Sequence, residues 1–266
     1  MSANPQDVWL PLINQLSTDA PRWAVWKNAD AALSFSGDID SVAPSQDWER
    51  IDQTFSSWAT SQGFDVVLCR HLPGSLIAVA LDDRAKRVWE LHVVDRQMFR
   101  GTLLFRAEEL STLETRDSRG FRRLVPGAEG LFLLALNGLR FPGRCNLSGL
   151  ESKGVRNLLR VDPEGMLATT RFFGLAGYPL RRLALAVAEG GWSKSSAVLF
   201  EILRAARIIK APLDLARRLR FRFHDLGRCP VLRMTGSGRN FPLDLESWLD
   251  EVVATGHHIL MSDERT

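Results

Sequence analysis

Three strand-like stretches that follow one another between residues 65 and 94 constrain the fold more than any other feature of this sequence. They are rich in β-branched and aliphatic side chains and comprise residues 65–71, 76–81 and 87–94. The polar turn 82–86 joins the last two into a hairpin. Beyond residue 143 the apolar residues recur at helical spacing instead. This order predicts an α+β protein, with a sheet and flanking helices first and a mostly helical part after it.

Shorter runs complete the expected sheet and its helices. Strand-like runs occur at 23–26 and 36–42. The helical patterns of the N-terminal part lie at 5–18, 47–58 (with Gly63 as its stop) and 126–139. The helices expected in the C-terminal part are 149–159, 163–173, 179–189, 193–209, 214–223 and 242–256. We therefore expect two domains, 1–145 and 146–266.

The composition is that of an ordinary globular chain. Of the 266 residues, 45% are hydrophobic and 24% are charged. No apolar run is 18 residues long or longer, which is the length that a membrane-spanning helix needs. The N-terminus is polar, unlike a secretory signal, and the three widely spaced cysteines suggest reduced thiols. These features predict a cytoplasmic protein without a transmembrane segment.

Charge is distributed unevenly along the chain. Residues 1–140 contain 15 basic and 18 acidic residues (net −3), whereas 141–266 contain 19 and 13 (net +6). Within 204–239 there are ten Arg or Lys against two Asp, a local net of +8. Such a region can bind an anionic partner: phosphate, nucleic acid or an acidic surface. A solvated, arginine-rich helical face is the alternative, and the alternation of basic and apolar residues in 217–224 fits a plain amphipathic element as well as a single-stranded nucleic acid site.

Asp38 and Asp40 are the candidate metal ligands. Alternate side chains of a strand project to one face, so these two carboxylates point together while Ile39 faces the other way. A carboxylate pair of this kind can share Mg²⁺ (or Mn²⁺) ions, which neutralise a triphosphate and lower the pKa of an attacking hydroxyl. Surface aspartates two residues apart are also common, so the pair alone leaves both interpretations open.

Several motifs follow one another around this pair. They are Trp23-Ala-Val-Trp-Lys-Asn28, a spacer, Ser36-Gly-Asp-Ile-Asp40, a helix, Gly63-Phe64, a hairpin, Glu90-Leu-His-Val-Val-Asp95 and Arg100-Gly101. Their order resembles the DNA polymerase beta-type nucleotidyltransferase superfamily, in particular small bacterial members found alone or fused ahead of thymidylate-kinase-like domains. The resemblance covers about residues 21–140, and it implies a nucleotidyltransferase-like mixed sheet and an NTP substrate. Residues 141–266 show no such resemblance.

The resemblance also implies roles for individual residues. Asp38 and Asp40 match the metal ligands of the family. Ser36 and Gly37 match the tight turn that lets backbone amides approach a phosphate. Lys27 stands where relatives tend to have arginine, and it is expected either to contact a phosphate or to be an ordinary solvated lysine.

Two departures from the family pattern bear on activity. The Gly-Ser signature about ten residues before the aspartates is absent, since residues 28–35 read Asn-Ala-Asp-Ala-Ala-Leu-Ser-Phe. The third carboxylate of active members has three competitors here. We expect Glu90 as the third acid and metal ligand, because alternation places it on the face opposite the apolar side chains of its strand. His92 on the same face is a base, a metal ligand or a hydrogen-bonded strand histidine, and Asp95 is an acid or a turn cap.

Three further motifs have plain interpretations. Residues 234–240 contain glycines but lack the lysine and spacing of a phosphate-binding loop, so we expect a glycine turn. Residues 190–195 are expected to be an interhelical loop with Ser193 as N-cap. His257 and His258 are adjacent, and their side chains diverge.

Two functions remain after these observations. The first is a Mg²⁺-dependent nucleotidyltransferase that moves a nucleoside monophosphate from an NTP to an unknown hydroxyl or phosphate acceptor. The second is a catalytically degenerate domain that binds a nucleotide or an anionic partner in a regulatory role. The missing Gly-Ser turn motivates the second.

Overall fold

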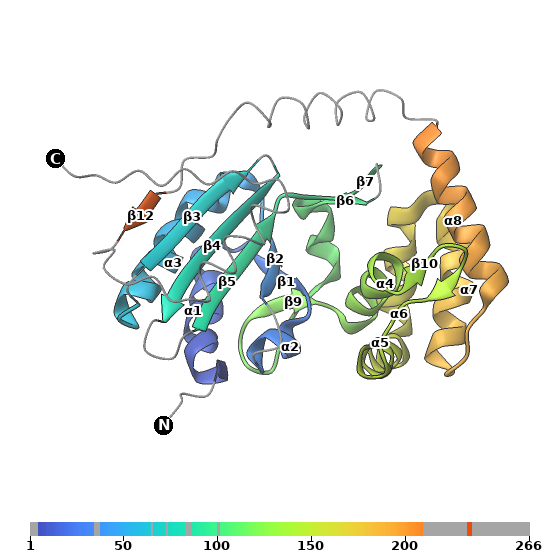
Figure 1. The fold of residues 1–266 in the computed structure, drawn as a ribbon, viewed down its shortest axis with the longest axis horizontal. Coiled ribbons are helices and arrows are strands. Elements are labelled where there is room, and N and C mark those ends of the chain that lie inside the picture. Colours follow the sequence, from blue (N-terminus) through green and yellow to red (C-terminus); the bar gives the residue numbers. More distant parts are fainter. Residues whose placement is uncertain are drawn as a thin grey trace. The chain divides into compact units, whose positions relative to one another are not determined.

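The computed structural model describes residues 5–34, 38–64, 66–72, 74–82, 87–99, 102–209 and 233–235 (Figure 1). These residues belong to two compact units. The first contains the described parts of Met1–Trp23 and Asn28–Asp95 together with 233–235, and the second contains Ala24–Lys27 and the described part of Arg96–Arg218. Both helices and a mixed sheet are present, which confirms the α+β class.

The sheet of the first unit contains the predicted hairpin. Its strands are β2 (Ile39–Val42), β3 (Val66–Leu72), β4 (Ser75–Asp82), β5 (Arg87–Val94) and β12 (Arg233–Thr235). They lie in the order β12-β3-β4-β5-β2. The pairs from β12 to β5 are antiparallel, as expected for the hairpin, whereas β2 runs parallel to β5. The parallel pair makes the sheet mixed and places the start of β2 beside the middle of β5.

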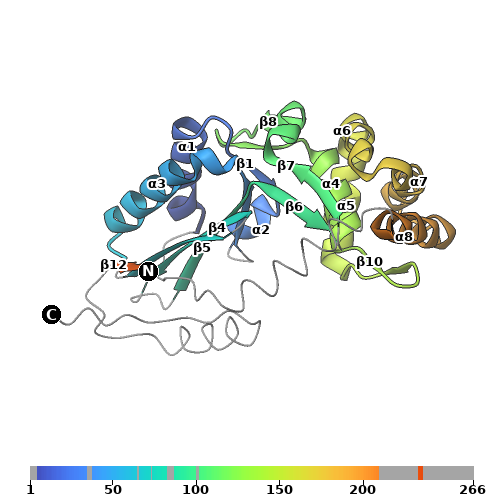
Figure 2. The ribbon, with the colours of Figure 1, turned by 90° about the horizontal axis from the view of Figure 1, so that it is seen from above.

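Helices α1 (Pro5–Asp19) and α3 (Trp48–Ser61) cover one face of this sheet (Figure 2). The core between them is aromatic, because Trp9 of α1 stacks on Trp58 of α3 at 5.4 Å and meets Trp89 of β5 edge-on at 5.2 Å. Helix α3 stops where the sequence predicts, since Gly63 adopts a φ of 71° that favours glycine. Two short helices, α2 (Ala29–Leu33) and η1 (Ser45–Asp47), flank β2 in the chain.

The second unit combines short strands with the predicted helices. Its strands are β1 (Ala24–Lys27), β6 (Arg96–Phe99), β7 (Thr102–Arg106), β8 (Glu114–Arg116), β9 (Arg122–Leu124), β10 (Leu139–Arg140) and β11 (Arg144–Cys145). Its helices are η2 (Ala107–Leu113), α4 (Pro126–Leu136), α5 (Gly149–Val161), α6 (Pro163–Thr169), η3 (Thr170–Ala176), α7 (Gly177–Ala188) and α8 (Lys194–Ile209). The strands from β6 to β11 have no counterpart among the predicted elements.

The boundary between the two units differs from the one expected near residue 145. The division falls between Asp95 and Arg96, and β1 joins the second unit. The reason is pairing: Val25 of β1 lies opposite Arg123 of β9 in a parallel pair, and β1 also contacts α4. Residues 96–124 therefore belong with the helices that follow them.

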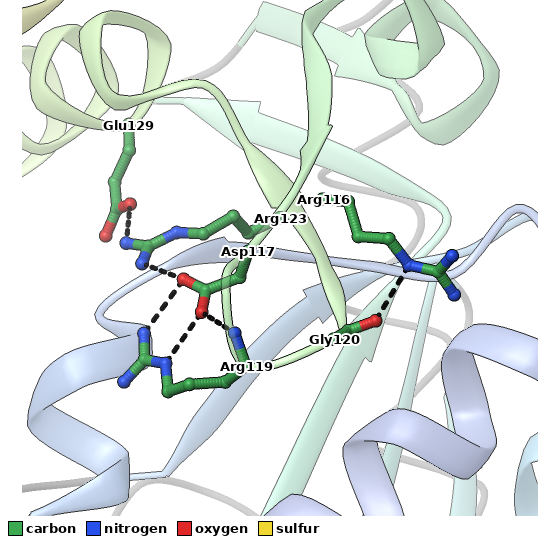
Figure 3. A network of polar contacts seen from close by, with 6 residues as sticks. All are labelled: Arg116, Asp117, Arg119, Gly120, Arg123 and Glu129. Atoms are coloured by element: carbon green, nitrogen blue, oxygen red, sulfur yellow. Dashed lines mark hydrogen bonds and ion pairs between the residues drawn. The ribbon is translucent and has the colours of Figure 1, made fainter.

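A buried network of charges holds the turn between β8 and β9 (Figure 3). Asp117 accepts hydrogen bonds from the side chain and backbone amide of Arg119, and these hold the pKa of its carboxyl well below the usual range. Arg123 bridges Asp117 at 2.9 Å and Glu129 of α4 at 2.6 Å. The network ties the β8–β9 turn to the first turn of α4.

The helices that the sequence predicts between residues 126 and 209 are found close to their expected bounds, whereas η2 was not predicted. The expected helix 163–173 is an exception, because α6 ends at Thr169 and the chain continues as the 3₁₀ helix η3. The helices expected at 214–223 and 242–256 lie outside the described residues. Among the described residues, none of the helices has both the length and the apolar character that a membrane span needs.

Candidate metal centre

Strand β2 presents Asp38 and Asp40 on one side, as the alternation predicts. Asp38 directly precedes the strand and Asp40 is its second residue. Asp40 is buried, with 4% of its surface exposed, and Ile39 between them is completely buried in the core. Burial of a carboxylate is costly without compensating positive charge or hydrogen bonds. The buried carboxylate of Asp40 therefore requires a nearby positive charge or hydrogen bonds.

The parallel pairing of β2 with β5 brings a histidine to the two aspartates. Asp40 lies opposite His92 in the register of these strands. The Nδ1 atom of His92 is 3.5 Å from Oδ1 of Asp40. The hydroxyl of Ser41, which is also buried, donates a hydrogen bond of 3.0 Å to the carbonyl of His92. Backbone pairing and this hydrogen bond together fix the position of the histidine on β5.

Asp38, Asp40 and His92 form a group that could hold a metal ion. Each offers one ligand atom, and these atoms all lie within 4.8 Å of one another. Two ligands on opposite sides of an ion with bonds of about 2.1 Å are about 4.2 Å apart, and two adjacent ligands are about 3.0 Å apart. The three side chains would therefore have to move closer together to share one divalent cation.

Glu90 lies two residues before His92 on β5, opposite Val79 of β4. Burial and, to a smaller extent, the negative charges of Asp38 and Asp40 together raise the pKa of its carboxyl to about 7, although His92 acts in the opposite direction. The expected third acid is therefore close enough to interact with the aspartate pair. The group within 4.8 Å nevertheless contains His92 in the place where we expected Glu90.

Of the other residues singled out in the sequence, Lys27 and Asp95 are described, and Ser36 and Gly37 are not. Lys27 is the last residue of β1 in the second unit, and its ammonium lies 5.0 Å from the ring centre of Trp26. Ser36 and Gly37 lie outside the described residues. Asp95 follows β5, and its backbone amide donates to the carbonyl of Gly74 at 3.2 Å, next to the register pair Ser75 and Val94 of β4 and β5.

The remaining motifs are described only in part. Ser193 accepts a hydrogen bond from the amide of Ser196 at 3.4 Å at the start of α8, which confirms it as an N-cap. Met234 and Thr235 lie in β12, paired with β3, while the glycines of 236–240 lie outside the described residues. The basic stretch 217–224 and the pair His257 and His258 also lie outside them.

The chain matches no protein-family model, and neither a curated protein sequence nor a solved structure matches it. The resemblance of residues 21–140 to the polymerase beta-type superfamily therefore stays a prediction. The arrangement of side chains on β2 and β5 is independent of that resemblance, and it can be assessed by its chemistry alone.

The electrostatics of the cluster favour a bound cation. Three carboxyl groups, those of Asp38, Asp40 and Glu90, interact with one another on two neighbouring strands, and His92 partly offsets their repulsion. A divalent cation would neutralise this charge and is often the largest local charge in such a site. The donor set of two carboxylates and one imidazole suits a divalent ion.

The sequence located every member of this group, although it ranked them differently. Strand alternation placed Glu90 and His92 on the same face of β5. The choice between them depended on the register of β5 against β2, which residue patterns do not contain. A parallel register with Asp40 opposite His92 is the observation that decided it.

Proposed function

We propose that the protein is a divalent-metal-dependent nucleotidyltransferase that transfers a nucleoside monophosphate from an NTP to a hydroxyl or phosphate acceptor. The observation that carries the proposal is the group formed by Asp38, Asp40 and His92 at the parallel pair β2–β5. The motif order around Asp38 and Asp40 supports the same reaction class. Mg²⁺ or Mn²⁺ is the cofactor that this reaction class uses.

The residues of the chain would act by positioning. The acceptor oxygen attacks the α-phosphorus and forms a new P–O bond, the bond from that phosphorus to the pyrophosphate oxygen breaks, and the acceptor proton leaves to solvent or a base. A bound divalent cation neutralises charge on the phosphates and lowers the pKa of the attacking hydroxyl. Asp38 and Asp40 would hold it, and the buried backbone of β2 keeps Asp40 in place. Catalysis of this type depends on preorganised charge more than on movement.

Pyrophosphate release tests the proposal. The full chain is incubated with Mg²⁺ or Mn²⁺, each of the four NTPs labelled at the α-phosphate, and acceptors that include sugars, nucleic acid and protein. We expect label transfer and pyrophosphate release with at least one combination, and loss of about 100-fold or more in Asp40→Asn, because that substitution removes a charged metal ligand. Glu49→Gln changes an exposed residue of α3, so it is the matched control and should retain activity.

One result would redirect the proposal. Saturable NTP binding in the presence of metal, without pyrophosphate release across all acceptors, would contradict transfer and favour the degenerate, nucleotide-binding function.

A further inference from the structure

We propose that His92 supplies a nitrogen ligand to the cation held by Asp38 and Asp40, so that this site prefers a divalent first-row transition ion to Mg²⁺. The inference deepens the proposed function and rests on it only for the reaction that the metal serves. Metal binding and its selectivity are properties of the side chains themselves.

The distance between His92 and Asp40 supports direct ligation. Their Nδ1 and Oδ1 atoms are 3.5 Å apart. An N–H···O hydrogen bond is ordinarily about 2.7 to 3.2 Å long, so this approach is longer than such a bond. Two ligands at adjacent positions around one ion with bonds of about 2.1 Å are about 3.0 Å apart. The observed distance of 3.5 Å is thus close to the distance between two adjacent ligands of one ion.

The position of His92 is fixed by strand pairing, because the residue lies within β5 and not in a loop. His92 lies in the middle of the paired part of β5, with Asp40 of β2 on one side and Ile77 of β4 on the other. The buried Ser41 hydroxyl holds its carbonyl. The imidazole is 31% exposed and the Asp40 side chain 6%, so the group opens on the side of the histidine. An ion can enter there and retain waters or ligand oxygens at its remaining positions.

The donor set determines which ion is preferred. Mg²⁺ demands near-ideal octahedral oxygen coordination and dehydrates reluctantly, so an imidazole is a poor ligand for it. Imidazole suits the later first-row ions, and affinity at a given site rises from Mn²⁺ towards Zn²⁺ and Cu²⁺. Replacement of an expected third carboxylate by a histidine nitrogen therefore shifts selectivity away from Mg²⁺.

Electron paramagnetic resonance of Mn²⁺ bound to the full, metal-stripped chain tests the inference without any nucleotide. Pulsed measurements detect the ¹⁴N nucleus of an imidazole that is bound directly to Mn²⁺. We expect this nitrogen coupling in the wild-type protein, and we expect Mg²⁺ to displace Mn²⁺ only at a concentration about tenfold higher or more. Absence of the coupling, absence of Mn²⁺ binding, or equal affinity for the two ions would overturn the inference.

His92→Gln provides the matched variant. It should lose the nitrogen coupling and at least about tenfold in Mn²⁺ affinity, since even an outer-shell partner of a metal ligand is worth that much. Its Mg²⁺ affinity should change much less, because the oxygen ligands Asp38 and Asp40 remain. Glu49→Gln should behave as wild type. If circular dichroism shows that His92→Gln does not fold, the presence or absence of nitrogen coupling in the wild-type protein tests the inference by itself.

The outcomes separate this inference from the proposed function. Nitrogen coupling and Mn²⁺ preference without pyrophosphate release leave the metal site standing and contradict nucleotidyl transfer. Pyrophosphate release that His92→Gln supports equally well with Mg²⁺ and Mn²⁺, together with no nitrogen coupling in the wild type, leaves transfer standing and overturns the role of His92.

Discussion

Arg123 is held between two acids and is nearly buried, with 11% of its side chain exposed. Its guanidinium contacts Asp117 at 2.9 Å and Glu129 at 2.6 Å (Figure 3). Removal of one partner from a buried ion pair is strongly destabilising, because it leaves a charge without compensation. We expect Arg123→Met to lower the free energy of unfolding by about 3 kcal/mol or more, measured by denaturant titration. Arg116→Met, which loses one exposed hydrogen bond to the Gly120 carbonyl, is the control and should cost less than about 1 kcal/mol.

Glu90 makes the stability of the metal-free protein depend on pH. Its pKa is about 7 in the folded state against an ordinary value of 4.5, so between these pH values the folded state retains the proton while the unfolded state loses it. Stability therefore falls as pH rises from about 4.5 to 7 and stays lowered above that. The shift of 2.5 units corresponds to a penalty on the order of 3 kcal/mol, at about 1.4 kcal/mol per unit.

Glu90→Gln should remove this penalty. In chelator, the variant should exceed the wild type in unfolding free energy by an amount that grows between pH 5 and pH 8. Denaturant titrations at both pH values measure the difference, and Glu49→Gln should show no such growth. An equal difference at both pH values would contradict the assigned environment of Glu90.

At the scale of elements, Asp162 joins two helix N-termini. Its carboxylate accepts hydrogen bonds from the amides of Gly127 in α4 at 3.0 Å and Gly165 in α6 at 2.9 Å. A carboxylate at a helix N-terminus interacts favourably with the unpaired amides and the helix dipole. The approach requires glycine at position 127, because a Cβ there would lie 1.9 Å from the carbonyl oxygen of Asp162 and 2.4 Å from the amide nitrogen of Met166.

Gly127→Ala should consequently force α4 and α6 apart. The contacts are with backbone, which cannot rotate away, so we expect a loss of about 2 kcal/mol or more, comparable to an overpacked core. Gly154→Ala is the matched control within α5, since nothing lies within 4 Å of the new Cβ. Alanine favours a helix over glycine, and that variant should gain up to about 1 kcal/mol. Thermal unfolding of the two variants and the wild type measures whether stability falls in Gly127→Ala and rises in Gly154→Ala. An equal change of stability in the two variants would contradict the α4–α6 contact.

Elements differed in how far residue patterns could locate them. The β4–β5 hairpin and the C-terminal stop of α3 at Gly63 were both predicted, since each depends on neighbouring residues. Strands β8 and β9 were not, because each is three residues long and too short for a clear period. Pairing of β9 with β1 joins Val25 to Arg123, and a contact so distant in sequence leaves no local pattern.

At the scale of the whole molecule, the three residues of the candidate metal site all lie in the first unit. A ligand that binds only the folded state stabilises by mass action, about 2.7 kcal/mol at 100 times its dissociation constant. Hydrogen exchange with and without Mn²⁺ should therefore show slower exchange, by up to about 100-fold, for amides of β2 and β5. Amides of α7 and α8 in the second unit should exchange at the same rate in both conditions.

The spread of this protection reports on the cooperativity of the two units. Slowing confined to the first unit means that each unit opens separately. Equal slowing of α7 and α8 would contradict separate opening and show that the chain unfolds as one body. Exchange in chelator provides the reference, and Asp40→Asn should abolish the effect of the ion.

Residue patterns were enough to predict the α+β class, the hairpin, four helices of the C-terminal part and the shared face of Asp38 and Asp40. These features follow from periods of two and 3.6 residues, which neighbouring side chains express directly. Residue patterns could not show that His92 lies within 4.8 Å of the ligand atoms of both aspartates, or that β1 joins the second unit. Both depend on the register of strands far apart in the chain, such as Asp40 of β2 opposite His92 of β5, and packing of the core selects that register.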